Sequence, residues 1–365
     1  MRAAMLSLRL VLALLAHFCS QSVASDMRKA TVVVYPAPAD EMPSPDFTID
    51  AYTRASENPD REAPEKHSVF VYASYMFNAA SSHRLWGRPV SNVSFAYFDF
   101  DGGPVSLVIT VQRKRTFPAD LSDVVVRPLS AGLELTPPPA GLDSQYSATL
   151  TLSAPINLSL EPWGVESPLH IFANPLEHNV PTAETPGVMF FGPGVHFVNN
   201  PVEIPDDTTV YIAGGAIIKS NYDPHAPVSN DTGGTYGYKF STIPSTFTAL
   251  MKDGVRAKNV TIRGRGIIDG RHTFEHRQRH KLIQVQFADA VKVEGVVLRE
   301  SSGWNMMLDH ASKVHVDNVK IVSHFCNSDG LDLCGLTDSL VERSFVHNGA
   351  CAIRVCLRVL FVSFD

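Results

Sequence analysis

Four short segments repeat one pattern in the second half of the chain and decide the predicted fold. They read Asn259-Val-Thr-Ile-Arg-Gly264, Ala290-Val-Lys-Val-Glu-Gly295, Lys313-Val-His-Val-Asp-Asn318 and, more weakly, Ser339-Leu-Val-Glu-Arg-Ser344. Each alternates apolar and polar residues and then breaks at Gly, Asn or Ser, as a short strand followed by a turn does. A unit this small cannot bury its own apolar face, whereas stacked copies share one continuous core. Because no unit contains a helix-length segment, the repeat predicts an all-β parallel β-helix; an ordinary antiparallel β domain is the alternative.

The region before this repeat has a different rhythm. Residues 27–180 are rich in β-branched and aromatic residues, and Pro, Gly and Asp turns separate most of the apolar segments. The segments most typical of strands lie at residues 32–35, 69–72, 93–98, 105–111, 124–126 and 146–152. Several short strands at this spacing are typical of an antiparallel β-sandwich. The proline-bearing stretch 174–187 predicts a linker, so we expect a sandwich domain at 27–180 and a β-helix domain at 186–365.

The first 25 residues have the pattern of a secretory signal peptide. Arg2 and Arg9 supply a positive start, residues 10–18 form an apolar run too short to span a bilayer, and small residues follow at 22–25. No later run reaches the roughly 20 apolar residues that a spanning helix needs. We therefore expect a secreted, extracellular protein that is not membrane-bound once the signal is removed. Four N-glycosylation sequons agree with this compartment, at Asn92, Asn157, Asn230 and Asn259.

Four cysteines remain once Cys19 leaves with the signal: Cys326, Cys334, Cys351 and Cys356. In an oxidising compartment they predict one or two local disulfides, and three pairings are open. Zinc binding is the rival interpretation, but there is no CxxC and the nearby histidines form no familiar ligand pattern. We therefore expect no metal and no cofactor. The mild net charge of −6 argues against nucleic acid as the main partner, and we expect a monomer.

The stretch Asn327-Ser-Asp-Gly-Leu-Asp332 places two carboxylates three residues apart. A turn stabilised by its own side chains is the structural alternative for such a sequence. In a β-helix, however, equivalent positions of successive coils line up along one face and can form a groove for an extended polymer. Hydrolysis of a glycosidic bond uses one carboxyl group to protonate the leaving oxygen and another to activate water. Asp329 and Asp332 are therefore the candidate catalytic residues, and a polysaccharide is the candidate substrate.

The order of these phrases resembles that of the polygalacturonase-like glycoside hydrolases, family 28. The phrases are Gly264-Arg-Gly-Ile-Ile-Asp-Gly270, Ser301-Ser-Gly-Trp-Asn305, Val314-His-Val-Asp-Asn-Val-Lys-Ile321 and Asn327-Ser-Asp-Gly-Leu-Asp332. This resemblance implies a right-handed parallel β-helix and hydrolysis with inversion. The predicted sandwich and two further phrases together resemble the related family 49. These phrases are Phe191-Gly-Pro-Gly-Val-His196 and Tyr211-Ile-Ala-Gly-Gly-Ala216. Members of that family, dextranase and isopullulanase, cleave α-glucans.

The resemblance also assigns roles to single residues. Asp329 matches the first catalytic aspartate, which helps to activate water, and Asn327 and Asp332 match neighbours that shape the site. Two histidines, His310 and His324, flank this phrase and are candidate sugar-binding residues, with a structural role as the alternative. One coil later the family carries an Asp-Asp pair that includes the general acid, where this chain has Ala350-Cys351. The family's later Gly-His and Arg-x-Lys phrases are not found either, so we expect a β-helix that is incomplete at its C-terminal end.

The segment 271–281 holds four Lys or Arg residues and three histidines against one acid. A basic rim suits an anionic polymer such as polygalacturonate, because cations raise the local concentration of substrate; a solvated loop is the alternative. We therefore expect a secreted glycoside hydrolase of the polygalacturonase type. The alternatives are a dextranase- or isopullulanase-type α-glucan hydrolase and an inactive carbohydrate-binding remnant that lacks the general acid. A metal-dependent polysaccharide lyase is a third, but it would need a calcium cluster that the sequence does not show.

Overall fold

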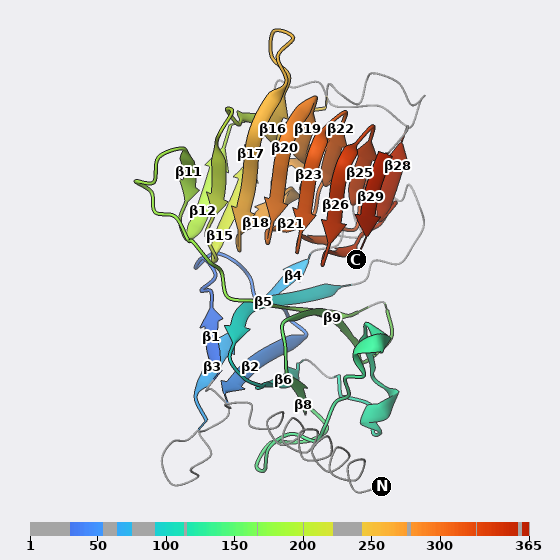
Figure 1. Ribbon diagram of the computed structural model, residues 1–365. Helices are drawn as coiled ribbons and strands as arrows, with labels where there is room; N and C mark the ends of the chain where they lie inside the picture. The colour runs from blue at the N-terminus through green and yellow to red at the C-terminus, as the bar shows by residue number, and fades with distance from the viewer. Residues whose placement is uncertain are drawn as a thin grey trace, which may run out of the picture.

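The computed structural model contains two β domains, a sandwich followed by a parallel β-helix that lies against it (Figure 1). It describes residues 30–53, 64–74, 92–112, 115–165, 167–199, 201–221, 243–275, 279–325, 327–356 and 360–364. The predicted signal peptide, Asn230 and Cys326 lie outside these ranges. Among the described residues, no helix has the length and apolar character needed to cross a membrane. The predicted all-β fold class is confirmed.

Each coil of the β-helix contributes one strand to each of three parallel sheets. Sheet 1 consists of β11 (Val188–Phe191), β14 (Thr209–Ile212), β17 (Ala257–Gly264), β20 (Ala288–Glu294), β23 (Ser312–Asp317), β26 (Thr337–Glu342) and β29 (Leu360–Phe364). Sheet 2 consists of β12 (Gly194–Val198), β15 (Ala216–Ser220), β18 (Ile267–Asp269), β21 (Val297–Arg299), β24 (Lys320–Val322) and β27 (Phe345–His347). Sheet 3 consists of β13 (Val202–Glu203), β16 (Ser245–Leu250), β19 (Lys281–Gln286), β22 (Met306–Asp309), β25 (Leu331–Cys334) and β28 (Ile353–Cys356).

The repeat seen in the sequence is the set of sheet 1 strands, stacked in register. Val293 pairs with Val316, and Val316 pairs with Val341, so that one apolar column runs through the core of the helix. The first residue of each copy has a left-handed backbone, as at Lys313 with φ 51° and Asp338 with φ 48°. The predicted start of the fourth copy at Ser339 is therefore wrong by one residue. The reason is that a serine, not a valine, occupies the first inward position of that strand.

The sandwich contains a six-stranded and a four-stranded sheet around a separate apolar core. The larger sheet contains β1 (Thr31–Val34), β4 (Val71–Ser74), β5 (Val93–Asp101), β7 (Val125–Arg127), β9 (Ile156–Glu161) and β10 (Leu169–Asn174). The smaller sheet contains β2 (Phe47–Thr53), β3 (Lys66–Val69), β6 (Val105–Val111) and β8 (Ser147–Leu152). Two short 3-10 turns follow β6, at Leu121–Asp123 and Leu129–Ala131. The sandwich is antiparallel as predicted except for one pair, since β10 runs parallel to β5.

Sheet 2 of the β-helix packs on the larger sheet of the sandwich. Aromatic side chains of the sandwich, among them Tyr72 and Phe95, lie in one buried cluster with Ile267 and Val297 of sheet 2. Aromatic and aliphatic burial of this kind contributes about 25 cal/mol for each Å² of apolar surface removed from water. Sheets 1 and 3 do not take part in this contact cluster. Their outer faces are therefore where functional groups of the β-helix are to be sought.

Candidate active site

The two predicted acids lie at the start of β25 in sheet 3. Leu331 and Leu333 point into the core of the β-helix, so the alternation of the strand directs Asp332 to the outer face. Gly330 between the acids is required by packing, because a Cβ atom there would lie 2.2 Å from the carbonyl oxygen of Ala352 on the next coil. The glycine thus lets two coils approach closely at the point where both acids are presented.

Hydrogen bonds to the coils on either side fix the backbone around Asp329. Asn305 donates its backbone N–H to the carbonyl oxygen of Asp329 at 2.8 Å, and Gly330 donates to that of Cys351 at 2.8 Å. The side-chain amide of Asn348 bridges the carbonyl oxygens of Ser328 and Cys351 at 2.9 and 2.8 Å. Residues 350–351 therefore lie on the coil directly after Asp329, the place where the family resemblance puts the missing acid pair.

Asp332 is completely buried, and neither of its carboxylate oxygens has a hydrogen-bond partner within the described residues. Burial raises the pKa of Asp332 to about 8, and the negative charge of Asp329 adds to the rise. Burial also raises the pKa of Asp329, which the Arg354 guanidinium opposes. An ionised carboxylate without donors is strongly disfavoured away from water, so these surroundings favour the protonated form of Asp332.

Two cations approach this pair of acids. Lys281, at the start of β19, is buried, and burial lowers the pKa of its ammonium group to about 8 although Asp332 and Asp309 favour the charge. Arg354 on β28 pairs in register with Asp332, and its Nη1 lies 3.6 Å from Oδ2 of Asp329. The guanidinium carbon of Arg354 also lies 5.8 Å from the ring centre of Trp304. Sequence reasoning assigned no role to Lys281, Arg354 or Trp304 individually.

The remaining predicted binding residues are less closely grouped. Asn327 lies two residues before Asp329, and its buried side-chain nitrogen has no hydrogen-bond partner within the described residues. His310 is exposed, binds Asp309 and stacks on Phe287 with ring centres 5.0 Å apart. His324 instead donates from Nδ1 to Oε1 of Glu300 at 2.9 Å. The structure thus places Asn327 beside the acids, whereas the described contacts of His310 and His324 are with other residues.

Only part of the segment 271–281 can form the predicted basic rim. The segment begins with a short helix, α2 (Arg271–Glu275), and Arg271 pairs with Glu41 and Asp269 rather than facing solvent. His280 is buried and hydrogen-bonded to Ser220 and Thr246, and burial lowers its pKa to about 3. Residues 276–278 lie outside the described residues. Arg271 and His280 therefore point inward, and Lys281 belongs to the acid site.

The described sequons and cysteines differ in accessibility. Asn92 and Asn259 are exposed, whereas the side-chain nitrogen of Asn157 donates to Asn318 at 3.1 Å and to the carbonyl oxygen of Arg343 at 2.9 Å. A glycan on that nitrogen would displace one of these bonds between the domains. Cys334 is buried, and Cys351 is exposed and carries a free thiol. Cys326 and the side chain of Cys356 are outside the described residues, so the disulfide pairing stays a prediction.

The arrangement is suited to proton transfer. Burial raises the pKa of the Asp332 carboxyl group to about 8 and also raises that of Asp329, and two cations flank the pair. Neighbouring carboxyl groups pushed apart in pKa are the usual source of an acid and a base within one site. Within the described residues, Asp332, Asn327 and Asn305 each have a buried side-chain atom without a hydrogen-bond partner. Such groups are normally satisfied, so their clustering marks a place where a polar ligand gains hydrogen bonds.

Comparison with known proteins gives matches among solved structures alone. No family model matches the chain, and no curated protein does. Dex49A from Penicillium minioluteum is 13% identical over 91% of this chain and 79% of that chain, with a TM-score of 0.49. A family 28 exopolygalacturonase from Yersinia enterocolitica is 13% identical over 71% of this chain and 67% of that chain, with a TM-score of 0.40. At these values the likeness assigns neither a family nor an activity.

Proposed function

We propose that this chain is a secreted glycoside hydrolase of the polygalacturonase-like class, with Asp329 and Asp332 as its catalytic carboxyl groups. The observation that carries the proposal is the buried Asp332, whose carboxylate oxygens have no partner within the described residues, beside Asp329 on the outer face of a parallel β-helix. Glycosidic hydrolysis needs one carboxyl group with a proton and one without it. The order of phrases around Asn327–Asp332, which resembles that of family 28, supports the same reaction class.

The two carboxyl groups have different roles in this proposal. Asp329 lies nearer to the surface and activates the attacking water, while Asp332 holds the proton that the leaving oxygen requires. Asp332 is 0% exposed, so its proton reaches a substrate less readily than one on an exposed acid would. Cys351 is exposed and lies on the next coil beside the site. An aspartate at 350 or 351 would therefore supply a more accessible acid than Asp332.

An anionic polysaccharide is the substrate class that the site favours. Lys281 and Arg354 place two cations beside the acids, and Arg354 is a quarter exposed. A guanidinium group binds a sugar carboxylate through charge-assisted hydrogen bonds, which a neutral glucan cannot form. Polygalacturonate is therefore preferred to dextran in this proposal. The secretory pattern of residues 1–25 and the exposed sequons at Asn92 and Asn259 support an extracellular site of action.

Release of reducing ends from polygalacturonate and from dextran tests the proposal. We expect slow release from polygalacturonate by the unchanged chain and about 10²–10⁴-fold faster release after Ala350→Asp and Cys351→Asp, the usual contribution of a placed general acid. Adding Asp329→Asn to the repaired chain should abolish the gain. Asp289→Asn on sheet 1 is the matched control and should leave it unchanged. No release from either polymer by either chain would refute the hydrolase.

A carbohydrate-binding protein without catalysis is the second candidate, and one observation favours it. The coil that should carry the acid pair has Ala350-Cys351, and Asp332, whose pKa burial raises to about 8, is completely buried. Equilibrium binding separates the two functions, because a remnant retains affinity for oligogalacturonate without releasing reducing ends. If the unchanged chain binds oligogalacturonate and only the chain with Asp at 350 and 351 releases reducing ends, the loss of activity is assigned to residues 350–351.

A further inference from the structure

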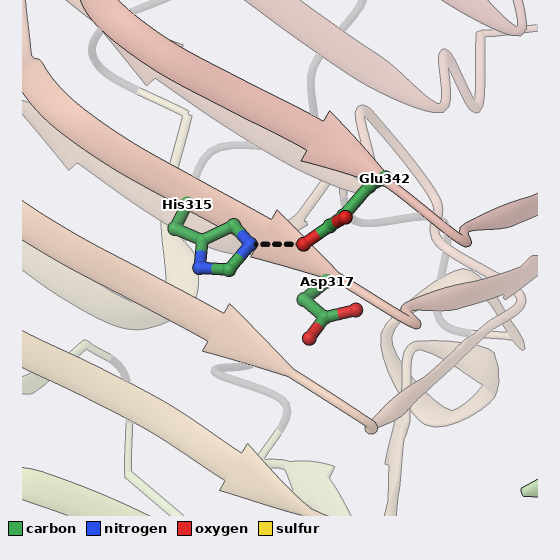
Figure 2. A group of neighbouring side chains, drawn as sticks. All are labelled: His315, Asp317 and Glu342. Carbon is green, nitrogen blue, oxygen red and sulfur yellow. Dashed lines mark hydrogen bonds and ion pairs between the residues drawn. The ribbon is translucent and has the colours of Figure 1, made fainter. Parts of the chain in front are cut away.

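Three side chains with metal-binding groups meet on the outer face of sheet 1 (Figure 2). Val314 and Val316 of β23 point into the core, so the alternating His315 and Asp317 leave from the opposite face. The neighbouring strand β26 pairs Asp317 directly with Glu342. We propose that His315, Asp317 and Glu342 form a site for a divalent transition-metal ion, and that zinc is its best occupant. This site is separate from the proposed catalytic acids on sheet 3.

The distances between the donor atoms suit a small ion. One nitrogen or oxygen atom from each side chain lies within 4.8 Å of those of the other two, and Nε2 of His315 lies 2.8 Å from Oε1 of Glu342. Zinc bonds of about 2.0–2.2 Å would place tetrahedral ligands about 3.4 Å apart. The side chains of His315 and Glu342 are 35% and 18% exposed, so small rotations can close the remaining gap.

Asp317 is the observation that separates this cluster from an ordinary charged surface. It is 6% exposed, and its buried Oδ1 has no hydrogen-bond partner within the described residues. Its Oδ2 accepts a hydrogen bond of 2.6 Å from Nη2 of Arg343. A buried carboxylate oxygen without a donor is costly, and a cation supplies the missing partner. Ligating carboxylates are commonly held by a hydrogen bond to the other oxygen, which is what Arg343 provides.

The donor set restricts the metal. One imidazole and two carboxylates suit zinc and its neighbours, whereas calcium takes six to eight oxygen ligands and soft ions prefer thiolates. Three protein ligands with an exposed histidine leave a fourth position for water. Arg343 also approaches Glu342 at 3.4 Å but is 62% exposed, so its guanidinium can turn away from that oxygen when an ion binds. An ion here would join two successive coils through their side chains.

Zinc titration of the metal-free chain by calorimetry tests the site. We expect one ion bound per chain and at least a tenfold loss of affinity in each of His315→Ala, Asp317→Asn and Glu342→Gln, the range in which ligand-shell changes act. Asp338→Asn is the matched control. It removes an exposed carboxylate from β26, the strand that carries Glu342. Asparagine tolerates the left-handed backbone of position 338, where φ is 48°. Its zinc affinity should equal that of the unchanged chain.

Cobalt substitution distinguishes this cluster from a cysteine site. Cobalt bound by histidine and carboxylate gives visible bands without the thiolate charge-transfer absorption, so Cys351→Ser should leave the spectrum unchanged. His315 and Glu342 are both partly exposed, so a double His315→Ala, Glu342→Gln variant keeps the fold. Any of three results would overturn the proposal. The unchanged chain binds no zinc, the double variant binds zinc at full strength, or the cobalt spectrum shows a thiolate band.

Discussion

Asp269 on sheet 2 and Asp332 on sheet 3 are two equally buried carboxylates in opposite electrostatic states. Both are 0% exposed. Burial alone would raise the pKa of Asp269, but Arg299 and Arg271 beside it hold that pKa well below its usual range. Asp332 has no donor within the described residues, and burial raises its pKa to about 8. Pairing, not burial, therefore separates a structural charge from a group that can exchange a proton at neutral pH.

The paired carboxylate belongs to the contact between the two domains. Arg299 is completely buried and donates to Glu41 of the sandwich at 2.8 Å as well as to Asp269. Arg271 donates to the same two acids. Both acids accept hydrogen bonds from two guanidinium groups, so this buried ion-pair cluster stabilises the contact between the domains. The unpaired Asp332 faces away from this contact, where a substrate can supply what the protein does not.

Breaking the paired cluster should produce the largest change in stability. Arg299→Met leaves Glu41 and Asp269 buried without one of their two cations, and loss of one partner of a buried ion pair costs about 3–5 kcal/mol. Urea unfolding at pH 7 measures this loss. Arg256→Met is the matched control, because its ion pair with Asp289 is 37% exposed on both sides and such pairs contribute at most about 1 kcal/mol. Equal losses in the two variants would contradict the contrast between the sites.

Replacing the unpaired Asp332 by a neutral residue should raise the free energy of unfolding, whereas Arg299→Met lowers it. The folded-state pKa of Asp332, about 8, exceeds the unfolded value of about 4, so the folded state binds the extra proton between these values. The free energy of unfolding therefore falls as pH rises through that window, by at most about 1.4 kcal/mol per pH unit. Asp332→Asn mimics the protonated acid and removes this slope, which stabilises the variant relative to the unchanged chain by up to about 5 kcal/mol at pH 8.

Unfolding of the variant and the unchanged chain at a series of pH values between 5 and 9 checks this expectation. Lys281 adds a second, separate effect, because its lowered pKa makes the free energy of unfolding rise between about 8 and its unfolded value near 10.4. Asp269→Asn is the control and should destabilise the protein at pH 7. An unchanged pH slope in Asp332→Asn would show that this carboxyl group is ionised in the folded chain.

The repeat predicted the β-helix because its inward positions are apolar in nearly every copy. The fourth copy was placed one residue late, since Ser339 occupies an inward position that valine fills in the other strands. The parallel pairing of β5 and β10 could not be predicted, because the two strands are far apart in sequence and each is buried on both faces. Local pattern therefore defines a strand, whereas its partner depends on the packing of the whole domain.

The acids of the candidate site were predictable and their cations were not. Asn327–Asp332 is a continuous phrase, so its residues could be found by reading along the chain. Arg354 reaches the acids because β28 pairs in register with β25, and Lys281 reaches them from an earlier coil. The coils differ in length, so no fixed sequence spacing reveals which residues become neighbours. The same reason hid the cluster of His315, Asp317 and Glu342, in which the third residue comes from another coil.

Of the substitutions at Arg299, Asp332 and Arg354, the one at Arg354 should have the smallest effect. Arg354 is the cation that pairs with Asp329 in the acid site. Its guanidinium lies 3.6 Å from Asp329 and opposes the rise that burial imposes on the pKa of both acids. Arg354→Gln should therefore raise both pKa values, by less than about one unit since this partly exposed pair is worth at most about 1 kcal/mol. Carboxyl-carbon NMR titration measures the shift without depending on activity, with Arg256→Gln, which removes an ion pair with Asp289 of sheet 1, as the control. In the repaired chain the same substitution should raise KM for polygalacturonate and leave dextran unaffected. Unmoved pKa values would mean that Arg354 does not act on the acids, and Asp329 would then be as unpaired as Asp332.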